Sequence, residues 1–458
     1  MSDIDVNTTT IKPETTAAPP TDKNESTLSF SAKQKWLMMF SLVFAGEIIF
    51  SLPFHVARFF RPTVLDVFQL SHAQLGDIFA IYGVTAMLAY FPGGALADKF
   101  SARALLITSL FLTAMGGLVF MTVPNAFVLA VLYGYWGITT IFLFWAALLK
   151  VTRLWGGDDD QGKAFGLLDG GRGLIAAGLA SLMVLFFSSL LPDDLAAISA
   201  EQRIYALRSV IALYSAATLL GVVFVWLWVP KMQIKRLHST RQSMQGIKEI
   251  ISKPRIWLQA IIVVMAYTAY KSLDFYASYA VEVLGMNEVS AAQLVSNAAY
   301  LRVFSAIAAG YFADKFSAGK VIIALFISLL ATYLSLALLG EQISLHTHSG
   351  IFVLGSNILV SFAAVYALRG VYFALLQDVG VKKAYTGTAI GVVSVIGYTP
   401  DVFLGSVAGR VLDANPGATG YYHFFLMLCG VAIVGIVVSA VLLYFNQKQS
   451  TASEKVSC

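Results

Sequence analysis

The sequence contains very little charge and very little cysteine. Only 12% of its 458 residues are Asp, Glu, Lys or Arg, whereas 58% are hydrophobic. Soluble proteins carry about 25% charged residues, so this composition excludes a soluble globular chain of this size. The two cysteines, Cys429 and Cys458, are too few for a disulfide framework and lack the spacing of a metal site.

Signatures of catalysis and of cofactor binding are missing as well. The sequence has no Walker-type glycine loop, no metal-ligand set and no nucleophile elbow. We therefore expect neither an enzyme nor a protein with a cofactor or a metal, and any transport must be driven by a gradient. The net charge of +5 does not indicate a nucleic-acid partner, because in a membrane chain the position of the basic residues decides their meaning.

Long hydrophobic runs are what the sequence has in abundance. An α-helix needs about 20 residues to cross the hydrocarbon core of a membrane. We expect spans at 36–59, 74–92, 104–123, 126–149, 164–191, 205–229, 256–284, 291–313, 321–339, 351–376, 384–409 and 421–445. The predicted fold is therefore an all-α membrane protein with twelve transmembrane helices in two sets of six.

Polar segments divide these spans into two bundles. The segment between the sixth and seventh spans carries seven basic residues against a single acid, Glu249. We expect a disordered tail at 1–32, six-helix bundles at 33–229 and 256–446, a basic loop at 230–255 between them, and a second tail at 447–458.

The basic residues indicate the orientation of the chain. Lys99, Arg103, Lys315 and Lys320 fall on the same side of the predicted spans as the basic loop, whereas acids dominate the other side. Short loops rich in Lys and Arg stay in the cytoplasm, so we expect both termini there. We interpret the basic loop as a determinant of topology, and contact with anionic lipid is the alternative.

A short polar insert occurs twice, near the same point of each half. It follows the second span at 93–103 and the eighth span at 310–320, and both copies contain Ala-Asp-Lys-Phe-Ser-Ala. A repeat of this kind indicates an internal duplication, which is the usual build of a membrane transporter. The first copy resembles the signature loop of the major facilitator superfamily, and the second is a weaker copy in which Gly319 replaces Arg103.

The resemblance implies a monomeric transporter whose two halves rock around a central site. Spans 1, 4, 7 and 10 would line much of the cavity. The insert would act as a conformational gate, in which Asp98 engages neighbouring helix ends and basic residues and holds one access state. Arg103 and the second-copy Asp314 belong to the same predicted gate.

Departures from other branches of this superfamily narrow the function. The fourth span has no arginine and the fifth has no proline, which disfavours proton-coupled drug export. The glycine-asparagine signature of nitrate and nitrite porters is also missing from the fifth span. The end of the fourth span resembles, loosely, the organophosphate and organic-anion branch.

Eight charged residues inside the predicted spans are candidates for a role at mid-membrane. A charge at mid-membrane costs about 2.5–3.5 kcal/mol, so each is a candidate functional residue with a partner to be found. The eight are Glu47, Asp169, Arg172, Lys271, Asp274, Arg302, Arg369 and Asp401.

The acids suggest a route for proton coupling. Glu47 is the leading proton carrier, because a carboxyl group in a low-dielectric cavity can bind and release a proton; the alternative is a structural ion pair. Asp274 lies three residues from Lys271, so these two either neutralise each other or contribute to proton coupling and substrate binding. For Asp169 and Arg172, which have the same spacing, we favour a structural pair.

The basic residues suggest the charge of the substrate. Arg302 and Arg369 have no acid one helical turn away and therefore need a partner from another helix or from the substrate. Guanidinium groups suit carboxylates and phosphates. Together with Lys271 they favour an anionic or zwitterionic substrate, and the nearby Tyr267 and Tyr270 complete the predicted binding site. We interpret Arg58, near the outer end of the first span, as an interfacial residue, and a residue that attracts the substrate at the entrance is the alternative.

The sequence thus predicts a secondary active transporter in the cytoplasmic (inner) membrane of a bacterium. It would import a small organic anion or zwitterionic metabolite by alternating access, with proton symport. An anion exchanger or an exporter of a metabolite or siderophore is the alternative within transport. A membrane receptor that keeps the fold but no longer transports is the alternative from another class.

Overall fold

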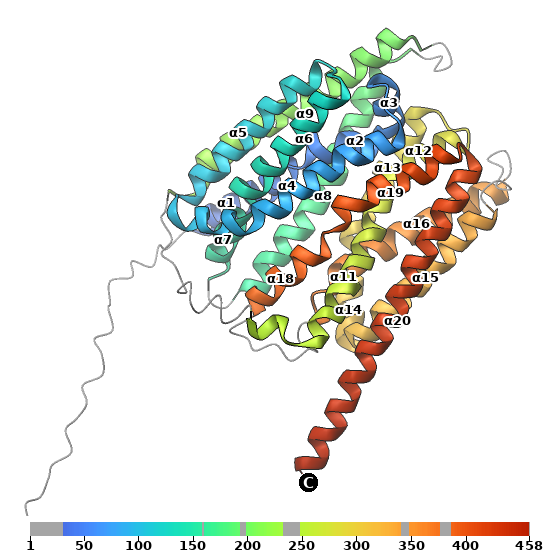
Figure 1. Ribbon diagram of the computed structural model, residues 1–458. Helices are drawn as coiled ribbons and strands as arrows, with labels where there is room; N and C mark the ends of the chain where they lie inside the picture. The colour runs from blue at the N-terminus through green and yellow to red at the C-terminus, as the bar shows by residue number, and fades with distance from the viewer. Residues whose placement is uncertain are drawn as a thin grey trace, which may run out of the picture.

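The computed structural model describes residues 31–157, 160–192, 198–231, 248–339, 348–375 and 386–457. Every regular element in these ranges is a helix (Figure 1). Eleven helical stretches are long and apolar enough to cross a membrane by length and composition. The predicted all-α membrane fold is therefore confirmed.

The helices of the first half correspond to the first six predicted spans. Two of these spans contain a π-helical segment, η1 in the first and η2 in the fourth. The elements are α1 (Ala32–Ile48), η1 (Ser51–His55), α2 (Val56–Phe59), α3 (Arg61–Val67), α4 (His72–Lys99), α5 (Ala102–Met121), α6 (Ala126–Gly137), η2 (Ile138–Trp145), α7 (Ala146–Gly156), α8 (Gln161–Ser189) and α9 (Ala200–Trp228).

The second half repeats this plan with more interruptions. The elements are α11 (Pro254–Ser272), the 3-10 segment η4 (Leu273–Phe275), α12 (Tyr276–Glu282), α13 (Glu288–Ala299), α14 (Leu301–Phe316), α15 (Ala318–Leu339), α16 (His348–Val371), α18 (Thr386–Gly397), α19 (Pro400–Ala414) and α20 (Ala418–Ser457). The expected first tail and the basic loop stay predictions, because 1–30 and 232–247 lie outside the described residues. The segment expected as the second tail continues helix α20 to Ser457.

The eighth span is the one expected span that is not among the eleven apolar stretches. In the structure it consists of α13 and α14, which join at Tyr300. Its sequence contains Gln293, Asn297 and the buried Arg302. These polar residues lower the mean hydropathy of the span; Gln293 and Asn297 are exposed, whereas Arg302 is buried.

Serine and glutamine pairs define where several spans begin. The side chains of Ser31, Ser71 and Ser199 each accept a hydrogen bond from the backbone N–H of a glutamine three residues later. Each glutamine side chain accepts one in return from the serine backbone N–H. These capping boxes satisfy N–H groups that have no partner inside the helix.

The polar insert is largely helical, which corrects one expectation. We expected the second span to end at Pro92, but α4 continues to Lys99 with Pro92 inside it. Asp98 therefore lies in the last turn of a helix. The polar residues of the insert therefore follow the apolar segment within the same helix. In the second copy α14 likewise continues to Phe316.

The two halves meet mainly through α4 against α19 and through α8 against α13 and α14. Glycines allow α4 and α19 to approach closely. A Cβ atom added to Gly76 would lie only 2.1 Å from the carbonyl oxygen of Gly405, and one added to Gly409 would lie 2.4 Å from that of His72. Such contact requires small residues, as in other membrane helix pairs.

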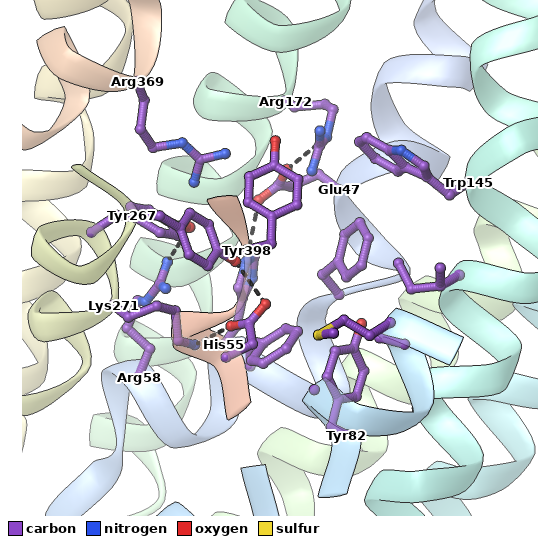
Figure 2. A pocket seen from close by; sticks show the side chains of 18 of the residues that line it. Glu47, His55, Arg58, Tyr82, Trp145, Arg172, Tyr267, Lys271, Arg369 and Tyr398 are labelled. Atoms are coloured by element: carbon purple, nitrogen blue, oxygen red, sulfur yellow. Dashed lines mark hydrogen bonds and ion pairs between the residues drawn. The ribbon is translucent and has the colours of Figure 1, made fainter. Parts of the chain in front are cut away.

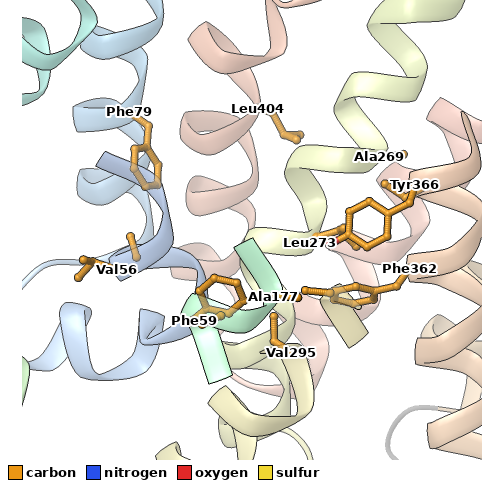
Figure 3. Packing of buried hydrophobic residues seen from close by; sticks show 14 of the residues in the cluster. Val56, Phe59, Phe79, Ala177, Ala269, Leu273, Val295, Phe362, Tyr366 and Leu404 are labelled. Atoms are coloured by element: carbon orange, nitrogen blue, oxygen red, sulfur yellow. The ribbon is translucent and has the colours of Figure 1, made fainter. Parts of the chain in front are cut away.

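A buried apolar core continues across this junction. Figure 3 shows Phe59 of α2, Ala177 of α8 and Val295 of α13 side by side, and all three are buried. The junction lies at the end of the bundle opposite the C-terminus of the chain (Figure 1). The halves are therefore closed against each other at that end.

Candidate functional site

A pocket lies between the two halves, and both contribute to it. Its wall comes from spans 1, 4, 7 and 10, as the resemblance implied, and also from spans 2, 5, 8 and 11. The lining residues are Glu47, Phe50, Phe54, His55, Arg58, Tyr82, Gly83, Ala86, Met87, Tyr90, Ile141, Trp145, Arg172, Tyr267, Tyr270, Lys271, Arg302, Arg369, Tyr398 and Asp401.

All the charged residues predicted for substrate binding line this pocket. Five of its residues are cationic: Arg58, Arg172, Lys271, Arg302 and Arg369. Two are carboxylates, Glu47 and Asp401, and two more carboxylates, Asp169 and Asp274, form ion pairs with the lining cations. Among the described residues of the site, the five cations therefore exceed the four carboxylates by one positive charge.

One group of these charges, the Glu47 cluster, consists of Glu47, His55, Asp169, Arg172 and Arg302. The carboxylate of Glu47 lies 3.0 Å from Arg172 Nε, 3.2 Å from His55 Nε2 and 3.7 Å from Arg302 Nη1. Arg302 Nη2 donates a hydrogen bond of 2.9 Å to Asp169 Oδ1. Arg302 belongs to α14, so the cluster joins the two halves.

The Glu47 cluster corrects the local pair expected in the fifth span. Asp169 and Arg172 point to different partners, Arg302 and Glu47, rather than to each other. The partner that Arg302 required from another helix is Asp169. Because α1 and α8 pack side by side, Arg172 reaches Glu47 across the helix contact.

The second group, the Asp274 cluster, consists of Arg58, Lys271, Asp274 and Asp401. Asp274 accepts hydrogen bonds from Arg58 Nε and lies 2.7 Å from Lys271 Nζ. Lys271 Nζ lies 3.6 Å from Asp401 Oδ1, and the Tyr267 hydroxyl donates to Asp401 Oδ2 at 2.9 Å. The i, i+3 pairing of Lys271 and Asp274 is confirmed.

Arg58 contradicts the expectation of an interfacial side chain. It is buried, and it connects the first half to Asp274 and Tyr270 of the second. Hydropathy could not reveal this, because Arg58 lies at the end of its span and its partners lie more than 200 positions away in the sequence.

Arg369 differs from the other four cations of the pocket. Within the described residues no carboxylate lies within ion-pair distance of its guanidinium group. That group lies over the Tyr270 ring at 3.9 Å and near the Tyr267 ring at 5.9 Å, which is a cation–π arrangement. Figure 2 shows Arg369 pointing into the pocket toward Tyr398, apart from the ion pair of Glu47 and Arg172.

The predicted gate residues lie away from the pocket, at the ends of α4 and α14 and the start of α5. Asp98 lies 3.5 Å from Lys150 Nζ, which also donates to the Ala97 carbonyl. Arg103 donates to the carbonyl of Trp226. Asp314 is exposed, without an ion pair to any described residue. The gating roles of Asp98, Arg103 and Asp314 stay predictions.

The opposite end of the bundle holds contacts that sequence reasoning missed, which we call the distal gate. The distal gate consists of Ser71, His72, Ala73, Gly76 and Asp77 of the α4 region with Gly405, Gly409, Arg410 and Asp413 of α19.

Asp413 binds the N-terminus of α4 from the other half. Its carboxylate accepts from Ser71 Oγ at 2.6 Å and from the backbone N–H groups of His72 at 3.0 Å and Ala73 at 2.8 Å. Beside it, Arg410 forms a two-pronged pair with Asp77 at 2.9 and 3.1 Å. A carboxylate at a helix N-terminus is favourable, so this contact holds the halves together.

Sequence reasoning gave several lining residues no role in the site, among them His55, Asp401 and Tyr398. His55 lies eight positions after Glu47, and only the π-helical turn of η1 brings the two together. Asp401 was recognised as an intramembrane charge, but its position gave no indication of a role. The remaining residue, Tyr398, belongs to the break between α18 and α19, which an apolar run does not reveal.

Comparisons with known proteins identify the family. A profile of the Major Facilitator Superfamily matches residues 36–400. The inner membrane protein YqcE of Escherichia coli (strain K12) is 28% identical over 435 residues, which cover 93% of this chain and 98% of that protein. The match therefore extends over both halves.

Solved structures show the same fold. The crystal structure of the nucleoside transporter NupG superposes with a TM-score of 0.69 at 13% identity, covering 90% of this chain and 99% of that one. The fucose:proton symporter FucP of E. coli superposes with a TM-score of 0.58 at 20% identity, covering 88% and 98%. The chain belongs to the major facilitator superfamily and is a multi-pass membrane transporter of the secondary type.

Proposed function

We propose that this transporter moves a small organic anion or a zwitterionic metabolite across the inner membrane by alternating access, with proton symport. One observation carries the proposal: the guanidinium group of Arg369 points into the pocket and has no carboxylate partner among the described residues. The name of the relative YqcE supports the location, and the fucose:proton symporter supports coupling to protons.

The charge balance of the site supports an anionic substrate. Arg58 and Lys271 share Asp274, Arg172 pairs with Glu47, and Arg302 pairs with Asp169. Arg369 is the cation that remains. An anion bound there would neutralise it, and its planar fork can donate two parallel hydrogen bonds to a carboxylate, phosphate or sulfonate.

The aromatic residues give the site a second binding surface. Tyr267 and Tyr398 lie with ring centroids 4.7 Å apart, and Tyr267 and Tyr270 are 5.6 Å apart. We assign these tyrosines to the non-ionic part of the substrate, where their rings offer apolar contact and their hydroxyls offer hydrogen bonds. Lys271 and Arg302 contribute positive potential and the connections between halves.

The conformational cycle would alternate between the two ends of the bundle. The distal gate is closed in this structure, so the pocket is separated from that end. In the opposite state the distal gate would open and the end that carries Asp98, Arg103 and Asp314 would close. The sequence suggested Glu47 and Asp274 for proton coupling, and both carboxylates join the halves through ion pairs.

Counterflow in proteoliposomes tests this proposal. The panel contains phosphorylated sugars, carboxylates, amino acids and siderophores, and Arg369→Ala is compared with the wild type. A hydrogen bond to a charged group contributes about 1.5–3 kcal/mol, so we expect binding of the transported anion to weaken about 10- to 100-fold. Arg208→Ala is the matched control, because Arg208 is exposed on α9.

The outcomes are distinct. Counterflow of an anion that is lost in Arg369→Ala and kept in Arg208→Ala supports the proposal. Exchange of a neutral solute with equal efficiency in both variants contradicts it. No flux of any substance in the panel would favour a receptor with the same fold.

A further inference from the structure

We propose that Asp401, at the start of α19, is the carboxyl group that takes up and releases the coupled proton. The proposal rests on the proposed symport and changes its proton site: Glu47 and Asp274 become permanently ionised members of their clusters. Three observations carry it. The negative charge of Asp401 has only one cation nearby, its Oδ1 atom accepts no hydrogen bond from the described residues, and the residue lies where the two halves touch.

The carboxylates Glu47, Asp274 and Asp401 differ in how well nearby cations compensate their negative charge. Glu47 has the guanidinium of Arg172 at 3.0 Å and a second cation, Arg302, at 3.7 Å. Asp274 has direct contacts with both Arg58 and Lys271.

Asp401 has one cation, Lys271, at 3.6 Å, and that lysine lies closer to Asp274 at 2.7 Å. A buried charge without a close partner is strongly disfavoured. Asp401 is therefore the carboxylate of this site that gains most from binding a proton.

The groups that face Asp401 do not supply the missing compensation. Its Oδ1 atom is buried and accepts no hydrogen bond from the described residues, while Oδ2 accepts one from Tyr267. The charged and titratable neighbours are Tyr267 and Lys271 from α11, Asp274 from η4, and Tyr82 and Tyr90 from α4.

Among these neighbours the acid Asp274 opposes a second negative charge. The Tyr267 hydrogen bond favours the ionised form, so Asp401 can release its proton once water reaches it.

The position of Asp401 couples its proton to the movement of the halves. A Cβ atom added to Gly83 of α4 would lie 2.8 Å from the Asp401 carbonyl oxygen, so α4 packs directly on the first turn of α19. When the halves separate along α4 and α19, that side of Asp401 loses its protein neighbour and gains water. The ionised carboxylate is then solvated, whereas the closed contact favours the protonated form.

A measurement without substrate tests this proposal. The full chain is reconstituted in vesicles of phosphatidylethanolamine and phosphatidylglycerol, and infrared difference spectra are recorded as the pH changes between about 9 and 5, a range in which buried carboxyl groups can titrate. We expect a carbonyl band of a protonated carboxylic acid to appear in the wild type and to be absent in Asp401→Asn. We expect Glu47→Gln to keep the band unchanged.

Two further variants keep Asp401 in place and shift its titration in opposite directions. Tyr267→Phe removes a hydrogen bond to the ionised form, so the midpoint should rise by about one pH unit. Asp274→Asn removes a negative neighbour and frees Lys271 for Asp401, so the midpoint should fall. These variants remain informative if Asp401→Asn does not fold.

The result that overturns the proposal is equally clear. A band that persists in Asp401→Asn and disappears in Glu47→Gln would show that Glu47 is the residue that binds the proton. The absence of any titrating band in the wild type would show that Asp401 is not a proton site. Because the measurement uses no substrate, neither result depends on whether the proposed anion transport is correct.

Discussion

Two layers of polar contact join the halves of this transporter, and they are built differently. The pocket layer consists mainly of buried ion pairs, and the side chains of Lys271 and Asp274 are only 8% and 5% exposed. The distal gate combines glycine contacts with exposed pairs, and the side chains of Arg410 and Asp77 are 61% and 49% exposed. Both layers connect the same two bodies.

The difference indicates what each layer can do during a conformational change. An exposed ion pair contributes little, because water replaces either partner easily. A buried charge that loses its partner is strongly disfavoured. The distal gate can therefore open at small electrostatic cost, whereas the pocket charges need compensation in every state. Asp401 meets that need by binding a proton.

The largest effect is expected from breaking the pocket layer. Asp274→Ala leaves Arg58 and Lys271 without their shared carboxylate, which should destabilise the protein by about 3–5 kcal/mol. Thermal unfolding in detergent, followed by tryptophan fluorescence, measures this. Asp77→Ala removes a carboxylate of the exposed layer and should lower the midpoint much less. Equal shifts for the two variants would contradict the comparison.

A larger side chain at the glycine contact should change how often the distal gate is open rather than the stability of the fold. Gly76→Ala places a Cβ atom 2.1 Å from the Gly405 carbonyl, and overpacking of this kind costs about 1–3 kcal/mol. That cost applies only to the closed state, so the open population should rise about 5- to 150-fold.

Distances between nitroxide labels at the exposed Gln69 and Ala414 measure the open population, with both native cysteines replaced. Gly94→Ala is the matched control, since a Cβ atom there would meet nothing within 4 Å. A label distance that is unchanged in Gly76→Ala would show that the glycine contact does not limit opening.

The smallest effect is expected from Asp413→Asn. The amide can still accept from the N-terminus of α4, but the charge that favours this contact is lost, which amounts to about 0.3–1 kcal/mol. The same pair of labels should report a two- to fivefold gain of the open state. Glu201→Gln changes an exposed carboxylate in the first turn of α9 that has no ion pair to a described residue, and it should leave the distances unchanged. Equal gains in both variants would show a non-specific effect.

Much of the fold could be predicted from the sequence, because the membrane imposes a length and a polarity on each span. The ends of helices could not. Pro92 and the fall of hydropathy at the polar insert both suggested that α4 ends early, yet the helix continues to Lys99. Loss of one hydrogen bond at a proline does not end a helix whose later residues still favour the helical state.

The pocket residues were predicted better than their partners. Lys271 and Asp274 meet because one helical turn separates them, and this can be seen in a sequence. Arg172 instead reaches Glu47 on a neighbouring helix, and Arg58 reaches Asp274 in the other half. Such pairs depend on how helices are packed, which no local spacing records. The same reason hid the contact of Asp413 with α4.

The π-helical segments η1 and η2 affect how this chain can be compared with its relatives. A π-helical turn closes its hydrogen bond over five residues instead of four, so each such turn holds one residue more than the α-helix around it. Both segments supply pocket residues, His55 from the first and Trp145 from the second. In a relative whose first or fourth span is a regular α-helix, an ungapped alignment would be shifted by one position beyond each segment. An alignment that transfers substrate contacts to this chain should therefore place a one-residue gap in each of these two spans.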